Sequence, residues 1–230
     1  MTALENLKRT TEDLFARNAI ERHPLFQRLE AGQLPPPKVA ALALQIGHVV
    51  DHFPRFLAAL IANIPDYRLR MPLVENLFEE HGRMHPRAVH VETYNVFLTG
   101  LGISAEQIAA SSATIPVIAY NRAITDLCLH HPFPEGLGAL GVIEEIVARA
   151  SLIVGRSAKK GSGSPDRPLA HFGDHETLDI GHANEIYALA ANFFEGDSQR
   201  LVDQGLRLGM YYHKRLYTEL LEEISSPTTC

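Results

Sequence analysis

Apolar residues recur every three or four positions along almost the whole chain, and segments of alternating polarity are absent. This spacing is typical of amphipathic helices, so the sequence predicts an all-α fold. The prolines at 35–37 are typical of a first helical turn, whereas Pro54 falls inside the same helix and is expected to kink it. We expect helices at residues 3–19, 36–63, 69–81, 86–101, 113–131, 135–156, 170–194 and 198–224.

One stretch has the composition of a connecting loop, GRSAKKGSGSPDRP at residues 155–168. It is rich in glycine, serine and lysine, and its largest apolar side chain is Ala158. We therefore expect a mobile surface connection between two helices. A lid over a neighbouring site is the alternative interpretation.

The bulk properties place limits on the function. With 230 residues and 46% hydrophobic content, the chain is expected to form a single domain over residues 1–230. A net charge of −6, with lysines and arginines scattered singly, argues against a nucleic-acid or membrane partner and favours a small-molecule substrate. The two cysteines, Cys128 and Cys230, suggest no disulfide framework, and the polar N-terminus lacks a secretion signal, so we expect a cytoplasmic protein.

Candidate chemistry centres on the stretch HETLDIGH, which contains His175, Asp179 and His182. A spacing of four and then three residues places these side chains within about 60° on one helical face. Two imidazoles and a carboxylate in this arrangement are half of a metal site, although a solvated polar face would show the same spacing. Apolar residues flank the three, and a buried polar trio needs partners that a cation would supply.

Two further stretches offer the other half of a metal site: EEHGRMHPRAVH with Glu80 and His90, and GVIEEIVARAS with Glu144. Three histidines and three carboxylates form a mixed nitrogen and oxygen set that suits two iron or manganese ions. Gly82 and Pro86 break the helix between Glu80 and His90, which lets both side chains turn inward.

Each of the two glutamates has a glutamate neighbour, Glu79 and Glu145. Adjacent helical residues point about 100° apart, so we expect only one of each pair to face the core. Glu144 shares its face with small and apolar residues, and we therefore assign Glu144 rather than Glu145 to the interior. Other histidines are expected at the surface or beside the ligands: His48, His52, His81, His85, His130, His131 and His213.

These motifs resemble a known superfamily. HPLFQRLEAGQL at 23–34, followed by Gln45, is similar to the opening of the TenA, PqqC and heme-oxygenase-like helical proteins. The pattern Glu80-x9-His90, Glu144 and His175-x3-Asp179-x2-His182 resembles the heme-oxygenase-like diiron oxidases and oxygenases, which include the CADD-like proteins. The LGI at 101–103 is also similar, and the likeness runs over about residues 20–220.

The resemblance implies a seven-helix bundle that holds two iron ions, with an iron–manganese pair as the alternative. It places Glu80, His90 and Glu144 on one side of the metals and His175, Asp179 and His182 on the other. It also implies O2 as co-substrate and an external electron donor, with N-oxygenation, oxidative decarboxylation or C–C cleavage of amino-acid-like or fatty-acid-like substrates. The apolar helix 36–63 is compatible with a homodimer.

Several departures from the family pattern bear on the reaction. CADD-like relatives that form aminobenzoate are expected to have a tyrosine where this chain has Phe26 and a lysine where it has Val154. The helix with Glu144 also lacks the nucleophilic cysteine of a TenA-type thiaminase. The alternatives to a diiron oxygenase are a metal-free oxidase or hydrolase of the TenA or PqqC type and a non-catalytic helical interaction protein.

Overall fold

Helices make up nearly all of the computed structural model, which describes residues 2–161 and 170–226, with side chains described except between 158 and 179. No strand occurs among these residues, which confirms the all-α fold. The elements in chain order are α1 (Ala3–Arg17), η1 (Ile20–Arg22), α2 (Pro24–Glu30), α3 (Pro36–Asn63), α4 (Tyr67–Glu80), η2 (Gly82–Met84), η3 (Pro86–Ala88), α5 (His90–Gly100), α6 (Ala105–Ala110), α7 (Ile115–His130), α8 (Phe133–Gly161), α9 (Ala170–Ala191) and α10 (Gly196–Ser225).

The described residues contain ten α-helices, more than the seven that the resemblance implies. Two of them, α2 and α6, have only 7 and 6 residues, which is too short for a periodic pattern to reveal them. The predicted loop 155–168 is also wrong in its first half, since α8 continues to Gly161. Alanine and lysine at 158–160 are good helix formers and extend α8, while residues 162–169 lie outside the described part of the chain.

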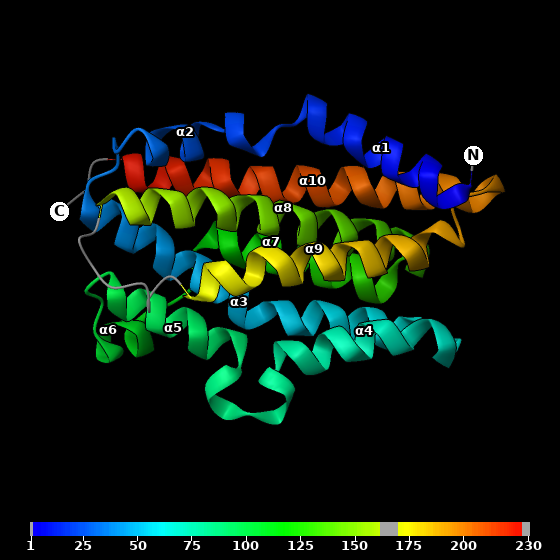
Figure 1. Ribbon diagram of the computed structural model, residues 1–230, viewed down its shortest axis with the longest axis horizontal. Coiled ribbons are helices and arrows are strands. Elements are labelled where there is room, and N and C mark those ends of the chain that lie inside the picture. The colour runs from blue at the N-terminus through cyan, green and yellow to red at the C-terminus, as the bar shows by residue number, and fades with distance from the viewer. Residues whose placement is uncertain (1, 162–169, 227–230) are drawn as a thin grey trace.

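Three long helices, α8, α9 and α10, run side by side through the molecule (Figure 1). α8 packs chiefly against α9 and α10, and its face towards them is fully buried. Glycine allows the close approach of α10, because a Cβ at Gly205 would lie 1.9 Å from the carbonyl oxygen of Glu135. α8 is therefore fixed on two sides, which gives its polar residues defined positions in the core.

α4 lies at the edge of the molecule, where it packs against α3 and α9 (Figure 1). Its inner face buries Leu73, Asn76 and Glu80, two of which are polar. Asp66 caps the start of the helix by accepting a hydrogen bond from the Arg68 amide at 2.9 Å. In the described part of the chain, no helix is long and apolar enough to cross a membrane.

Candidate metal centre

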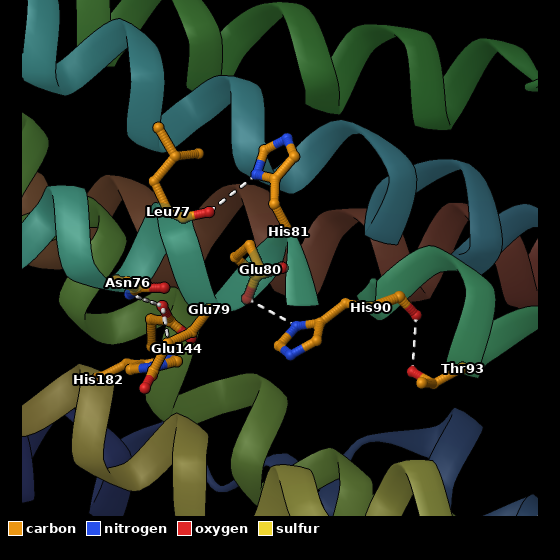
Figure 2. A network of polar contacts seen from close by, with 9 residues as sticks. All are labelled: Asn76, Leu77, Glu79, Glu80, His81, His90, Thr93, Glu144 and His182. Atoms are coloured by element: carbon orange, nitrogen blue, oxygen red, sulfur yellow. Dashed lines mark hydrogen bonds and ion pairs between the residues drawn. The ribbon is translucent and has the colours of Figure 1, made fainter. Parts of the chain in front are cut away.

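A tight turn brings Glu80 and His90 together. α4 ends at Glu80 and α5 begins at His90, as the break at Gly82 and Pro86 predicts. Gly82 has φ +61°, and a Cβ there would lie 2.4 Å from the main-chain carbon of Ala88, so only glycine fits this turn. The chain reverses, and His90 Nδ1 lies 2.9 Å from Glu80 Oε1 with both side chains buried (Figure 2).

Glu144 and His182 meet beside this pair, from α8 and α9. Glu144 is only 2% exposed, and its Oε1 accepts a hydrogen bond from Asn76 Nδ2 at 2.8 Å. His182 is 4% exposed, and its Nδ1 faces Glu144 Oε1 across 3.8 Å (Figure 2). Four helices, α4 and α5 together with the more distant α8 and α9, thus place carboxylate and imidazole groups in one buried region.

Glu79 also reaches this region, so the expectation that only one of Glu79 and Glu80 faces inward is wrong. Its Oε2 lies 2.7 Å from His182 Nε2, and its other oxygen pairs with Arg83. Burial acts to raise the pKa of the Glu79 carboxyl, but the hydrogen bonds from His182 and Arg83 outweigh it and lower the pKa overall. The length of the glutamate side chain lets it reach His182 from a position about 100° around the helix from Glu80.

The protonation of His182 follows from this contact. A carboxylate can only accept a hydrogen bond, so Nε2 carries the proton that points to Glu79. An imidazole with its single proton on Nε2 has a lone pair at Nδ1. Among the described residues, buried His182 Nδ1 and Asn76 Oδ1 have no hydrogen-bond partner. Nδ1 faces Glu144 Oε1 across 3.8 Å. Two electron-rich atoms in this position fit a shared metal ion.

Four of the six predicted ligands, Glu80, His90, Glu144 and His182, are buried in this region. α9 contains His175 and Asp179 as predicted, but their side chains lie outside the described residues. Within the described part of the chain, no three histidine, cysteine or acidic side chains are close enough to hold one metal ion. The ligand roles of the six residues therefore remain predictions.

Asn76 and Glu79 are the two residues of this region that the sequence analysis does not assign. Asn76 lies four positions before Glu80, so it occupies the same helical face, and this spacing is a signal that could have identified it. Glu79 has no comparable signal, because its orientation depends on where His182 lies in the folded protein.

Two side chains outside this region, His213 and Glu145, make contacts that the sequence does not predict. His213 is buried rather than at the surface: its Nδ1 lies 2.8 Å from the Tyr120 hydroxyl and its Nε2 lies 3.0 Å from the Tyr217 hydroxyl. Burial lowers the pKa of His213 to about 3. Glu145 is half-buried, pairs with Arg149 at 2.7 Å and accepts a hydrogen bond from the Tyr187 hydroxyl at 2.9 Å.

The chain matches a known family of iron-containing enzymes. A family model described as an iron-containing redox enzyme matches residues 40–214, and the chain belongs to this family. It is 30% identical over 167 residues to a 4-aminobenzoate synthase of Chlamydia pneumoniae, covering 71% of this chain and 72% of the relative. A 4-aminobenzoate synthase of Chlamydia muridarum is 25% identical over 210 residues, covering 90% of this chain and 85% of the relative.

Solved structures show the same fold. A CADD-like protein of unknown function from Nostoc punctiforme superposes with a TM-score of 0.83 at 18% identity, covering 97% of this chain and 99% of that one. A TenA homologue from P. horikoshii superposes with a TM-score of 0.73 at 18% identity, covering 96% and 99% of the two chains. The chain therefore has the heme-oxygenase-like fold, and its family makes it an iron-containing oxidoreductase.

Proposed function

We propose that the protein is a non-heme diiron oxidase or oxygenase that uses O2 on a small organic substrate. The observation that carries the proposal is the buried His182 Nδ1, which faces Glu144 Oε1 at 3.8 Å and has no hydrogen-bond partner among the described residues. A buried imidazole nitrogen and a carboxylate oxygen are ligands that iron prefers.

The charge of the region supports two divalent ions. Glu80, Glu144 and the predicted ligand Asp179 contribute three negative charges, which two Fe²⁺ ions would balance to within one charge. Glu80, His90 and Glu144 would hold the metals from one side, and His175, Asp179 and His182 from the other. Two reduced irons would supply electrons and open positions for the activation of O2, and an external donor would replace those electrons.

The surrounding residues have roles of their own. Glu79 accepts the Nε2–H of His182 and so keeps Nδ1 available as a ligand atom. Asn76 donates to Glu144 and fixes the orientation of that carboxylate. Burial of these groups excludes bulk water from the centre, which protects a reactive site from side reactions.

A cavity of ≈210 Å³ adjoins the centre and is the proposed substrate site. Its lining combines Glu80 with residues of α3, of the end of α4 and of the start of α5: Val50, Asp51, Pro54, Arg55, His81, Val89 and Val91. Pro54 lies inside α3 and lacks the N–H that would donate a helical hydrogen bond to the Val50 carbonyl. Arg55 and Asp51 provide charges of both signs around this small volume, which favours an amino-acid-like substrate over a fatty-acid-like one.

The relatives named 4-aminobenzoate synthase suggest a narrower reaction, but Phe26 and Val154 occupy the positions where the resemblance implies a tyrosine and a lysine. Phe26 is buried against Tyr217, with ring centroids 4.9 Å apart, and offers no hydroxyl. We therefore leave the substrate of this chain at the level of a small amino-acid-like molecule.

A metal-free reaction of the TenA type is less favoured by the structure. Cys128 is the free cysteine of the described residues, and burial raises the pKa of its thiol, which makes it a poor nucleophile. Cys128 packs in the hydrophobic core, which is not the environment of a catalytic thiol.

The test is iron content after anaerobic reconstitution, together with the absorbance change when reduced protein meets O2. We expect two irons per chain and an O2-dependent spectrum, with both lost in Glu144→Gln. Glu135→Gln is the matched control, because Glu135 is a buried carboxylate on the same helix about 13 Å along it. A chain that binds no iron, or equal losses in both variants, would exclude the proposed centre.

A further inference from the structure

A turn between α4 and α5 projects from the body of the molecule (Figure 1). It comprises residues 81–88, and every residue in it except Gly82 is exposed. Met84 is 76% exposed. A single exposed methionine is common on protein surfaces, but the backbone that holds this one is not.

Three successive residues of the turn have a left-handed backbone conformation. The φ angle is +61° at Gly82, +51° at Arg83 and +65° at Met84. Glycine adopts this conformation freely, whereas arginine and methionine adopt it at a cost in free energy, because the Cβ approaches the following carbonyl oxygen. Both side chains are exposed, so core packing does not select this conformation. Such strain clusters at functional sites.

The turn is positively charged, although the chain as a whole has a net charge of −6. It contains Arg83 and Arg87 together with the imidazoles of His81 and His85, and no aspartate or glutamate occurs in residues 81–91. Within the described ranges, Arg87 belongs to no ion pair at 4 Å or less. Arginine and methionine are enriched in protein interfaces, and basic groups around an apolar side chain fit an acidic protein partner.

Two side-chain contacts connect the turn to the candidate centre. Arg83 pairs with Glu79, and Glu79 Oε2 lies 2.7 Å from His182 Nε2. The side chain of Arg83 is 62% exposed, whereas that of His182 is 5% exposed. The turn also lies directly between Glu80 and His90, which are both buried in the centre. A protein bound to the turn would therefore have a short path to a buried proposed ligand.

We infer that the turn at residues 81–88 is the docking site of a small acidic electron-transfer protein. The inference rests on the proposed function, in which two Fe³⁺ ions must be reduced to two Fe²⁺ ions before O2 reacts. A carrier with a one-electron iron–sulfur cluster supplies this in two encounters. In each encounter the reduced cluster loses one electron and one Fe³⁺ gains it, and no bond or proton changes place. Redox partners bind through interfaces smaller than about 1,200 Å², which suits a single projecting turn.

The first test is binding, which does not require iron. The probe is a plant-type [2Fe–2S] ferredoxin, a small acidic one-electron carrier, titrated calorimetrically into the iron-free protein at low and at physiological salt. We expect binding that weakens as salt screens the charges. Arg87→Glu should weaken binding roughly tenfold at low salt, because it reverses an unpaired charge of the turn. Met84→Ser should also weaken binding, because it removes the apolar centre of the surface.

Arg200→Glu is the matched control. Arg200 is exposed, lies on α10 on the other side of the molecule from the turn, and forms no ion pair within the described ranges (Figure 1). It makes the same change in net charge as Arg87→Glu and should keep the wild-type affinity.

The second test follows electron transfer in the iron-loaded, oxidised protein. Reduced ferredoxin is mixed with it under anaerobic conditions, and the absorbance of the cluster reports the rate of its oxidation. Arg87→Glu should slow this reaction roughly tenfold at low salt. Reduction by reduced methyl viologen should not become slower, since this small cation needs no docking surface and is not repelled by an added negative charge.

The outcomes separate the docking site from the iron centre. A wild type that does not bind ferredoxin, or equal losses in Arg87→Glu and Arg200→Glu, would overturn the docking site. Binding of anionic lipid vesicles but not of ferredoxin, lost in Arg87→Glu, would overturn it in favour of a membrane surface. A protein that takes up no iron but shows Arg87-dependent ferredoxin binding would overturn the proposed centre and leave the docking surface supported.

Discussion

Acid should destabilise the protein through His213, which lies in the core between Tyr120 and Tyr217. The pKa of a histidine in the unfolded chain is about 6.5, whereas burial lowers the pKa of folded His213 to about 3. Between about pH 6.5 and pH 3, His213 therefore binds a proton in the unfolded state but stays neutral in the folded state. The stability that neutral His213 provides is complete above about pH 7 and is lost as the pH falls towards 3.

The size of the loss follows from these two pKa values. One pH unit corresponds to about 1.4 kcal/mol once the unfolded histidine is protonated, so the free energy of unfolding should fall by about 2 kcal/mol between pH 7 and pH 5 from this residue alone. The hydroxyls of Tyr120 and Tyr217 are neutral over this interval, because burial raises the pKa of both. Neither can supply a charge that would stabilise protonated His213.

Urea unfolding at a series of pH values, followed by circular dichroism, measures this effect. His213→Gln keeps an amide that can donate and accept hydrogen bonds but does not titrate, so its stability should fall by about 2 kcal/mol less than the wild type between pH 7 and pH 5. His130→Gln changes an exposed histidine and should keep the wild-type dependence. Parallel curves for the wild type and His213→Gln would refute the role of the buried imidazole.

Three further predictions concern single side chains. His182→Ala should remove at least one equivalent of iron, measured by mass spectrometry, and leave the helical circular dichroism intact, because it deletes a proposed ligand. Glu145→Ala should cost about 1–3 kcal/mol in chemical unfolding without loss of iron, since the buried Tyr187 hydroxyl loses its acceptor. Gly205→Ala should lower the free energy of unfolding by about 1–3 kcal/mol or more, because the added Cβ would lie 1.9 Å from the Glu135 carbonyl oxygen. This loss is measured as a lower melting temperature.

Much of the helical architecture can be predicted from the sequence, because periodic apolar positions mark long amphipathic helices. The range expected for α3, 36–63, agrees with the structure. The end of α8 is harder to predict, since glycine and serine after residue 160 suggest a loop while alanine and lysine before it favour helix. Local composition alone does not decide between these tendencies.

The candidate site, like the fold, can be predicted from the sequence only in part. Spacing along one helix places His182 on α9, and the glycine and proline between Glu80 and His90 predict the turn that joins them. Contacts between helices are not encoded in local spacing, so the pairing of Glu79 with His182 cannot be predicted from the sequence pattern. The burial of His213 is missed for the same reason, because its two tyrosine partners include one from another helix.

The order of the site residues along the chain has a consequence for biosynthesis. Glu80 and His182 are separated by about a hundred residues, which a ribosome adds in about 5–20 s. During this time α4 exists while α9, which packs chiefly on α8, has not yet been made. The nascent chain thus carries the acidic half of the proposed centre without the imidazole of His182, and stable iron loading has to wait until translation has passed α9.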